Sequence, residues 1–304
     1  MNQFTKQTTA EDVTENLDLS GQTMLVTGAT AGIGRETMRV LALRGAHVLA
    51  TGRTKAKVTA ASSDMPGTIT PVALELTDLN SVDHCTRTIL EAGLIPDAVI
   101  CNAGIYPFGK LELVSGVEQV FFANFLGHFV LINNLLPAMQ QRGTGKLVHV
   151  SSDSAYKQVP ACGIDFDNLC GEGAFHAGEA YGRSKLANAL FSLALAERLK
   201  GTNLTSNALH PGSIMTNISH SAPLWIKASL LLGRFFVRSV AEGAATQVYV
   251  ATHPDVEQVS GRFFDTCMPA DQVEQQLFAQ KALAQELWDV AEAMTERVRK
   301  VAIA

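Results

Sequence analysis

The stretch TMLVTGATAGIGRETMRVLALRGAHVLATG, residues 23–52, decides the fold. An apolar run over 23–28 predicts a buried strand, and apolar residues at helical spacing over 34–45 predict a helix that stops at a glycine. Residues 47–52 predict a second buried strand. Strands that lack a polar face are buried on both sides, as in parallel sheets covered by helices. The stretch therefore predicts the first β–α–β unit of a doubly wound α/β domain.

The same alternation of strands and helices continues along the chain. We expect further strands over residues 69–76, 97–104, 146–152, 204–212 and 261–264, and helices over 81–93, 112–140 and 178–200. These elements predict a single α/β domain over 19–304, with a doubly wound parallel seven-stranded sheet, behind an N-terminal extension over 1–18. Loops over about 153–178 and 213–238 follow strand ends, where ligands bind in such folds.

The composition excludes several classes of protein. A formal net charge of −5, with no block of Lys and Arg, argues against nucleic acid as a partner. The five cysteines show no CxxC spacing, so we expect buried thiols in a reducing compartment and no metal site. Residues 1–20 show no signal or transit sequence, and Lys227 and Arg234 interrupt the apolar segment 223–237, so we expect no membrane span. These features predict a cytoplasmic protein.

A glycine-rich turn, TGATAGIG, follows the first expected strand. Gly28, Gly32 and Gly34 permit a tight turn, and the backbone around Thr30 and Ile33 can then approach a pyrophosphate at the helix N-terminus. The order G-x-x-x-G-x-G differs from the general dinucleotide fingerprint, and no G-K-[ST] sequel of a nucleoside-triphosphate loop follows. The place of the turn between the first strand and the first helix predicts a bound dinucleotide.

The residues after the second strand indicate which dinucleotide is bound. An acidic residue there would bind the ribose 2′-hydroxyl of NAD, but the segment 51–55, TGRTK, contains no carboxylate. Arg53 and, from the helix start, Arg35 are placed to hold a 2′-phosphate, because a guanidinium binds phosphate through parallel hydrogen bonds. The alternative is that both are solvated surface cations. The pattern favours NADP(H).

Tyr181 and Lys185 stand at i and i+4 in the helical stretch YGRSKLANALF, so they lie on one helix face. A free tyrosine titrates near pH ~10, and a cation beside it favours the phenolate and lowers its pKa. We expect this effect to bring Tyr181 toward the range that a general acid or base needs. By itself, such a pair more often marks only a helix.

An ordered set of motifs carries a family resemblance: TGATAGIG, Asp78-Leu79, CNAG at 101–104, Asn124, the serine-containing strand at 146–152, Tyr181-x-x-x-Lys185 and HPG at 210–212. In this order the chain resembles the short-chain dehydrogenase/reductase family from Leu19 to about residue 265. The segments TTAEDVTENLDLSG, ETMRVLALRGAHV, AYGRSKLANALF and SGRFF resemble its retinol-dehydrogenase-like and WW-domain-oxidoreductase-like branch. The resemblance implies a Rossmann fold and an NADP(H)-dependent oxidoreductase.

The resemblance also implies a catalytic tetrad of Asn124, Ser152, Tyr181 and Lys185. Ser152, rather than Ser151, would hydrogen-bond the substrate oxygen, and Tyr181 would exchange a proton with it. Lys185 would bond the nicotinamide ribose and lower the pKa of Tyr181, while Asn124 would hold a water in the proton relay.

Further residues are implied to bind the cofactor. Asp78 would meet the adenine amino group, with Leu79 as its backbone neighbour. The others are the pyrophosphate turn, the segment after the fourth strand and the segment that fixes the nicotinamide carboxamide, namely Gly28, Gly32, Ile33 and Gly34, then Asn102, Ala103 and Gly104, then Pro211, Gly212 and Thr216.

The expected reaction is hydride transfer between the nicotinamide and a small-molecule carbonyl or alcohol. The apolar segment 213–238 favours a lipophilic or bulky substrate if it covers the site; otherwise it packs on the core or on a partner subunit. The alternative functions are a non-catalytic NADPH-sensing interaction protein and a reductase of an activated C=C bond. The helices at 112–140 and 178–200 either pair in a homodimer or are buried in the core of one chain.

Overall fold

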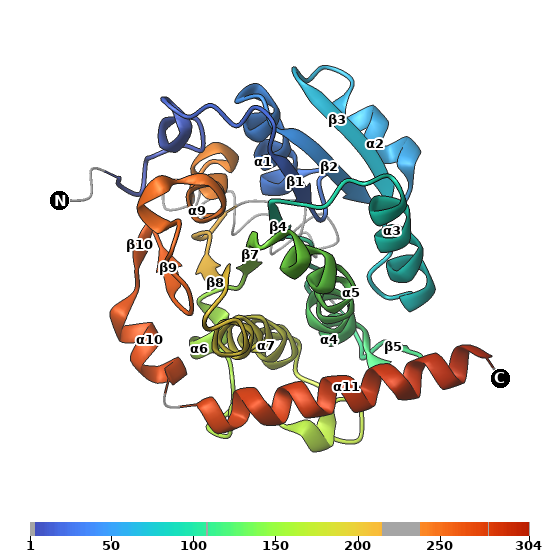
Figure 1. Ribbon diagram of the computed structural model, residues 1–304. Coiled ribbons are helices and arrows are strands. Elements are labelled where there is room, and N and C mark those ends of the chain that lie inside the picture. Colours follow the sequence, from blue (N-terminus) through green and yellow to red (C-terminus); the bar gives the residue numbers. More distant parts are fainter. Residues whose placement is uncertain (1–3, 108, 215–237, 279, 304) are drawn as a thin grey trace.

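The computed structural model describes residues 4–107, 109–214, 238–278 and 280–303. Within them, one eight-stranded sheet has the order β10-β9-β8-β7-β4-β1-β2-β3 (Figure 1). Its strands are β1 (Thr23–Val26), β2 (His47–Gly52), β3 (Thr68–Ala73), β4 (Ala98–Cys101), β7 (Thr144–Val150), β8 (Asn203–His210), β9 (Phe263–Asp265) and β10 (Met268–Pro269). All neighbours pair in parallel except β9 and β10. The doubly wound parallel sheet is confirmed, and the expected number of seven strands is wrong because the antiparallel β10 is added at the edge.

Helices cover both faces of the sheet. Successive residues of each strand point to opposite faces, so each face presents apolar side chains that the helices bury. Leu25 of β1 packs into the core on one face, while Met24 and Val26 pack into the core on the other. The first core lies under α3 (Leu79–Glu91), α5 (Gly127–Arg142), α7 (Ala177–Arg198) and α11 (Lys281–Ile303), and the second under α1 (Gly32–Leu43), α2 (Lys55–Ser62) and α9 (Val240–Thr252). The short helices α6 (Ser154–Lys157) and α10 (Asp271–Phe278) lie beside α7.

The helix expected over 112–140 begins later than predicted. Residues before it form a hairpin of β5 (Leu113–Val114) and β6 (Val117–Glu118), closed by Ser115 and Gly116 with φ of 51° and 75°. Positive φ at both turn residues gives the twist that a two-residue hairpin needs. The helical part then runs as α4 (Gln119–Phe121), a π-helical turn (Phe122–Leu126) and α5. Helices α2, α9, α10 and α11 were not among the expected elements.

Residues 4–18 of the expected N-terminal extension pack against the domain. The Phe4 ring meets the edge of Tyr249 at 5.5 Å between centroids, and the Ala10 amide donates to Ala241 O at 3.0 Å. Both partners belong to α9. The chain therefore contributes to the second core before β1 begins.

The C-terminal helix α11 covers the apolar faces of α5 and α7. The Trp288 ring lies edge-on to Phe129 at 5.1 Å and tilted against Phe191 at 5.6 Å. The Arg198 guanidinium stacks on the outer face of Trp288, 3.8 Å from the ring centroid. The structure thus shows the core-burial alternative for much of the 178–200 helix, and a homodimer stays a prediction.

We expect Trp288→Ala to lower the free energy of unfolding by about 3–5 kcal/mol, because it opens a large cavity between α11 and α7. Urea denaturation followed by circular dichroism measures the change. Val301→Ala in the same helix is the control: Val301 is 57% exposed, so its loss should change stability by less than about 0.5 kcal/mol. Equal effects of the two substitutions would contradict the packing described for α11.

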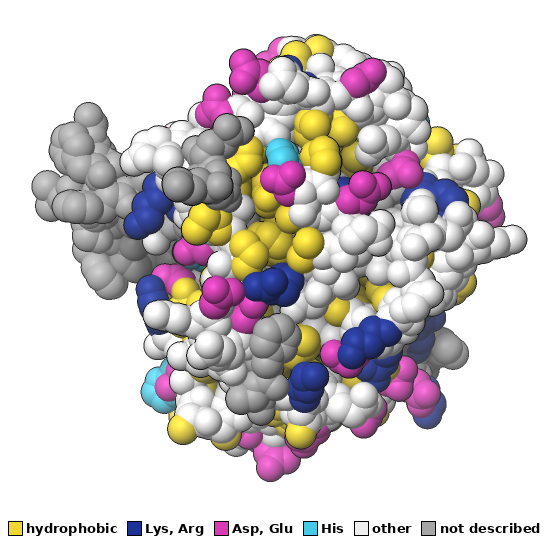
Figure 2. Space-filling view, turned by 60° about the vertical axis from the view of Figure 1, so that its left-hand side comes forward, with side chains coloured by type: hydrophobic (Ala, Val, Ile, Leu, Met, Phe, Trp, Pro, Cys, Tyr) yellow, Lys and Arg dark blue, Asp and Glu magenta, His cyan; other side chains and the backbone are white. Residues whose placement is uncertain are grey.

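Helix Gln119–Arg142 is the one helix among the described residues that is long and apolar enough to cross a bilayer. Its apolar window is 78% buried inside the protein, as expected of a core helix. On the face shown in Figure 2, basic side chains are interspersed with acidic ones and do not gather into one basic patch.

Candidate active site

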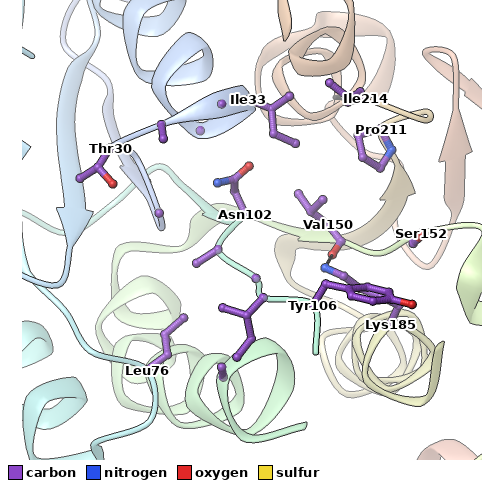
Figure 3. Close-up of a pocket in the computed structure, with 18 of the residues that line it drawn as sticks. Thr30, Ile33, Leu76, Asn102, Tyr106, Val150, Ser152, Lys185, Pro211 and Ile214 are labelled. Atoms are coloured by element: carbon purple, nitrogen blue, oxygen red, sulfur yellow. Dashed lines mark hydrogen bonds between the residues drawn. The ribbon is translucent and has the colours of Figure 1, made fainter. Parts of the chain in front are cut away.

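A cavity of about 870 Å³ lies at the carboxyl ends of β1, β4, β7 and β8 (Figure 3). Ligands bind at these strand ends in open α/β sheets. Many of the predicted site residues line it, namely Gly28, Thr30, Gly32, Ile33, Gly34, Arg53, Asn102, Ala103, Gly104, Ser152, Tyr181, Lys185, Pro211 and Gly212. Arg35, Asp78, Leu79 and Asn124 do not line the cavity. Thr216, with most of the 213–238 loop, lies outside the described residues.

The glycine turn forms one wall of the cavity. Gly28 and Gly32 have φ of 67° and 56°, in the left-handed region that favours glycine. At Gly34 a Cβ atom would lie 2.4 Å from both Gly28 O and Asn102 Nδ2, so no larger residue fits. Helix α1 begins at Gly32, earlier than predicted, which brings its free N–H groups into the turn. The turn therefore has the shape and the donors of a pyrophosphate site.

Thr27 fixes the segment after β4 against this turn. Its Oγ1 accepts the N–H groups of Asn102 and Ala103, each at 2.9 Å, and lies 2.9 Å from His128 Nε2. His128 Nδ1 lies 3.0 Å from the Asn124 carbonyl oxygen, which can only accept, so Nδ1 carries the proton and Nε2 accepts from Thr27. Burial lowers the pKa of His128 to about 4, so the ring is neutral. Neither Thr27 nor His128 was among the predicted site residues.

Asn124 lies in the π-helical turn, a feature that often marks functional sites. Its side chain is fully buried behind the cavity wall. Asn124 Oδ1 accepts the Ile105 N–H at 2.7 Å, and Nδ2 donates to Ile105 O and to Ser184 Oγ, both at 3.0 Å. The side chain therefore holds the wall segment that carries Gly104, Ile105 and Tyr106, and its role toward a water stays a prediction.

The two serines that end β7 have different surroundings. The Ser151 hydroxyl is buried and donates to the Lys185 carbonyl oxygen at 2.7 Å, which fastens β7 to α7. Ser152 Oγ donates to Asp153 Oδ1 at 3.2 Å and lines the same cavity as Tyr181, whose pKa it lowers. Ser152 is thus the serine that faces the cavity on the side of Tyr181, and its catalytic role stays a prediction.

Tyr181 and Lys185 come together on α7, as the i, i+4 spacing predicts. Lys185 Nζ donates to Val150 O at 2.9 Å and lies 5.6 Å from the centre of the Tyr181 ring. Figure 3 shows the Lys185 side chain reaching toward Val150 at the end of β7. The lysine is thus held between the tyrosine and the strand end.

The expected pKa of Tyr181 is wrong. Burial raises it to about 12; the hydrogen bond with Ser152 lowers it, while Asp153 and Tyr106 raise it further. Burial also lowers the pKa of Lys185 to about 8. Removing the phenolate from water outweighs the hydrogen bond with Ser152, so Tyr181 keeps its proton throughout the physiological range.

A polar group that was not predicted as part of the site borders Ser152. The Asp153 N–H donates to His210 Nδ1 at 3.2 Å, and Asp153 Oδ2 accepts from Lys157 Nζ at 2.8 Å. Burial lowers the pKa of His210, so this ring is neutral and carries its proton on Nε2. Asp153 and His210 both line the cavity, as does Tyr106, whose ring lies 5.0 Å from that of Tyr181.

At the β2 side of the cavity the cations differ from the prediction. Arg53 lines the wall together with Lys57, which the sequence analysis did not select. Arg35 turns away: its Nε donates to Ala61 O at 3.0 Å and its NH2 group pairs with Asp64 at 2.8 Å. The prediction of Arg35 as a phosphate ligand is therefore not supported by its placement.

The Asp78 side chain caps α3, accepting the Asn80 N–H at 3.0 Å, and Leu79 is buried. Their predicted contacts with adenine stay predictions. Among the described residues there is no group of three or more His, Cys, Asp and Glu that could hold a metal ion. Cys85, Cys101 and Cys267 are buried free thiols, whereas Cys162 is exposed, contrary to expectation.

Comparisons with known proteins agree with this site. A family model described as short chain dehydrogenase matches residues 22–164. Human retinol dehydrogenase 14 is 35% identical, with 91% of this chain and 87% of that protein covered. The WW domain-containing oxidoreductase of Pongo abelii is 33% identical, with 95% and 72% covered.

A solved structure from Beutenbergia cavernae, a putative NAD(P) dependent gluconate 5-dehydrogenase with bound NADP at low occupancy, is 25% identical. It matches with a TM-score of 0.65 over 82% of this chain and 96% of that chain. With a glycine turn, a Ser–Tyr–Lys group and these relatives, the chain belongs to the short-chain dehydrogenase/reductase family, in the branch of retinol-dehydrogenase-like and WW-domain-oxidoreductase-like proteins.

Proposed function

We propose that this protein is an NADP(H)-dependent reductase of a lipophilic carbonyl compound. The observation that carries the proposal is that one cavity holds both the glycine turn and the group of Ser152, Tyr181 and Lys185. We assign the reducing direction because burial raises the pKa of Tyr181 to about 12, so that the hydroxyl carries the proton that a carbonyl oxygen needs.

The glycine turn and the Pro211–Ser213 loop would hold a dinucleotide, which when bound would supply the hydride for the carbonyl carbon. Ser152 Oγ lies beside Tyr181 and hydrogen-bonds the carbonyl oxygen, where negative charge develops. The Tyr181 hydroxyl gives its proton to the same oxygen. The Lys185 ammonium, positive below pH about 8, stabilises the phenolate that remains.

Two cations beside the glycine turn support the choice of NADP(H). Gly52, at the end of β2, approaches Thr30 so closely that a Cβ atom would lie 2.6 Å from Thr30 Cγ2. Arg53 follows directly, and Lys57 lies in the first turn of α2 on the same wall. A 2′-phosphate at this position would meet both cations, and neither has an ion-pair partner among the described residues.

We expect the double substitution Arg53→Ala with Lys57→Ala to weaken NADPH binding roughly 10²- to 10⁴-fold, since each of the two charge-assisted hydrogen bonds contributes about 1.5–3 kcal/mol. Affinity for NADH should change by less than about twofold. Arg35→Ala is the matched control, because its guanidinium is bound to Asp64 outside the cavity. Fluorescence titration of both cofactors measures these affinities. A wild-type preference for NADH would contradict the assignment.

The substrate end of the cavity supports a lipophilic substrate. Ile105, Tyr106, Pro211 and Ile214 contribute apolar surface to the wall, and Ile105 is 38% exposed. Two relatives are named as a retinol dehydrogenase and an oxidoreductase. The test is NADPH oxidation with apolar aldehydes and ketones, polar sugars as controls, and product analysis to distinguish C=O from C=C reduction. Inactivity toward every carbonyl, with NADPH still bound, would instead support the sensing alternative.

A further inference from the structure

Arg238 has a set of contacts that the mechanism above does not use. Its side chain is 12% exposed, and its guanidinium donates to Pro211 O at 3.3 Å and to Thr266 Oγ1 at 2.6 Å. The same group faces Asp265 Oδ1 at 3.6 Å. The Arg238 backbone N–H donates to Ser213 O at 2.9 Å. The arginine thus joins the loop after β8 to the turn between β9 and β10.

The loop after β8 is shaped around this side chain. Gly212 has φ of 91°, and a Cβ atom there would lie 2.6 Å from Arg238 Cδ and 2.9 Å from Cζ. The arginine therefore occupies the space that a side chain at position 212 would need. Two further contacts with Arg238 hold the ends of this loop: the hydrogen bond to Pro211 O and the β-bridge between Ile214 and Arg238. Together these contacts hold the loop in one conformation.

The loop lies at the reacting end of the cavity. His210, which precedes it, accepts the N–H of Asp153, the residue next to Ser152. Pro211, Gly212 and Ser213 all line the cavity. The cations at the β2 side, Arg53 and Lys57, lie across β1, β4 and β7 from it in the sheet order. A dinucleotide with its adenosine phosphate at that side would place its nicotinamide beside this loop.

The anchor of Arg238 is itself braced. Thr266 and Cys267 form the β9–β10 turn with φ of 52° and 57°. The Cys267 N–H donates to Thr246 Oγ1 of α9 at 3.3 Å. The turn is hydrogen-bonded to α9, which packs in the second core, and Arg238 is hydrogen-bonded to the turn. The arginine therefore connects the loop that lines the cavity to a rigid part of the protein.

We propose that Arg238 is a positioning residue, which holds the Pro211–Ser213 loop so that it binds the nicotinamide half of the cofactor. The inference rests on the proposed function, because it requires a dinucleotide in the cavity. The proposal predicts that replacing Arg238 lowers the affinity for ligands that contain the nicotinamide half of the cofactor and leaves the affinity for the adenosine half alone unchanged.

The test compares two ligands, NADPH and adenosine 2′,5′-bisphosphate, by calorimetric or fluorescence titration. We expect Arg238→Ala to weaken NADPH binding roughly tenfold, as for the loss of one or two hydrogen bonds from a charged donor. Affinity for adenosine 2′,5′-bisphosphate should stay within about twofold. Arg238→Lys keeps the positive charge but lacks the two guanidinium nitrogens that bond Pro211 and Thr266 at the same time. Its NADPH affinity should therefore lie between those of the wild type and Arg238→Ala.

Arg142→Ala is the matched control. Its guanidinium also donates to backbone carbonyls, at 2.7 Å to Ile95 O and Pro96 O, but at the amino ends of β4 and β7, away from the cavity. It should lower the melting temperature without changing the ratio of the two affinities. Equal weakening of both ligands in Arg238→Ala and Arg238→Lys, or no weakening of NADPH binding, would overturn the proposal.

The wild-type protein separates this proposal from the proposed function. A wild type that binds neither NADPH nor NADH would overturn both. A wild type that binds NADH alone would overturn only the choice of cofactor, and the same comparison would then be made with NADH and ADP. In that case a selective loss of NADH affinity in Arg238→Ala still supports the positioning role, and a parallel loss of ADP affinity overturns it.

Discussion

Replacing Tyr181 by Phe is expected to lower kcat for carbonyl reduction by at least about 10³-fold while leaving the Kd for NADPH within about twofold. The substitution removes one hydroxyl and keeps the ring, which packs 5.0 Å from that of Tyr106. Ser152 would still hydrogen-bond the carbonyl oxygen, but no positioned acid would neutralise the charge that hydride transfer leaves there. Steady-state turnover and cofactor titration on the same preparation separate the two quantities.

Tyr249→Phe is the control for this experiment. Burial raises the pKa of Tyr249 to about 12, as it does for Tyr181, but Tyr249 lies on α9 in the second core and does not line the cavity. Its substitution should leave kcat within about twofold. The two variants therefore differ in the position of the lost hydroxyl, whereas the two hydroxyl groups share a pKa of about 12. Unchanged turnover in Tyr181→Phe would remove the basis for the mechanism.

The parts of the site that the sequence predicted are those whose geometry is local. The glycine turn is set by φ angles and a close approach within 28–34, and the pairing of Tyr181 with Lys185 needs only a helix. The direction of Arg35 was not predictable in this way. It depends on where the end of α2 places Ala61 and Asp64, which only the packed structure shows.

The same distinction explains the pKa of Tyr181. The neighbouring cation was visible in the sequence, but the depth of burial was not, because it depends on side chains from β7, α7 and the wall segment after β4. The contacts of Arg238 were likewise hidden, since its partners Pro211, Asp265 and Thr266 are distant in the chain. Long-range packing decides both.

For the fold, apolar runs predicted the seven central and flanking strands, since a strand buried on both faces has a continuous apolar sequence. The missed elements have weaker patterns. Strand β10 contains only Met268 and Pro269, and α2 buries only Val58. The sequence predicts a helix where the β5–β6 hairpin lies, because only the turn at Ser115-Gly116 departs from a stretch that is compatible with a helix.

The second large effect concerns Lys185, and its pKa gives the prediction a sign. A pKa of about 8 means that the ammonium is charged below pH 8 and loses its charge above it. If the charge stabilises the phenolate left on Tyr181, wild-type kcat/KM for reduction should be flat below pH about 8 and fall above it. Tyr181 itself, with a pKa of about 12, stays protonated across this range and adds no break.

Lys185→Met should therefore lower kcat for reduction by roughly 10²–10³-fold, the range typical of a lost electrostatic group at a reacting centre, and abolish the fall above pH about 8. Lys146→Met is the matched control. Lys146 lies in β7, the strand whose last residue accepts the Lys185 ammonium, and burial lowers its pKa too, but it lies outside the cavity. Its variant should keep both the rate and the fall near pH 8. A Lys185→Met enzyme that retained the wild-type pH profile would assign the break to another group, because a methionine at this position has no proton to lose.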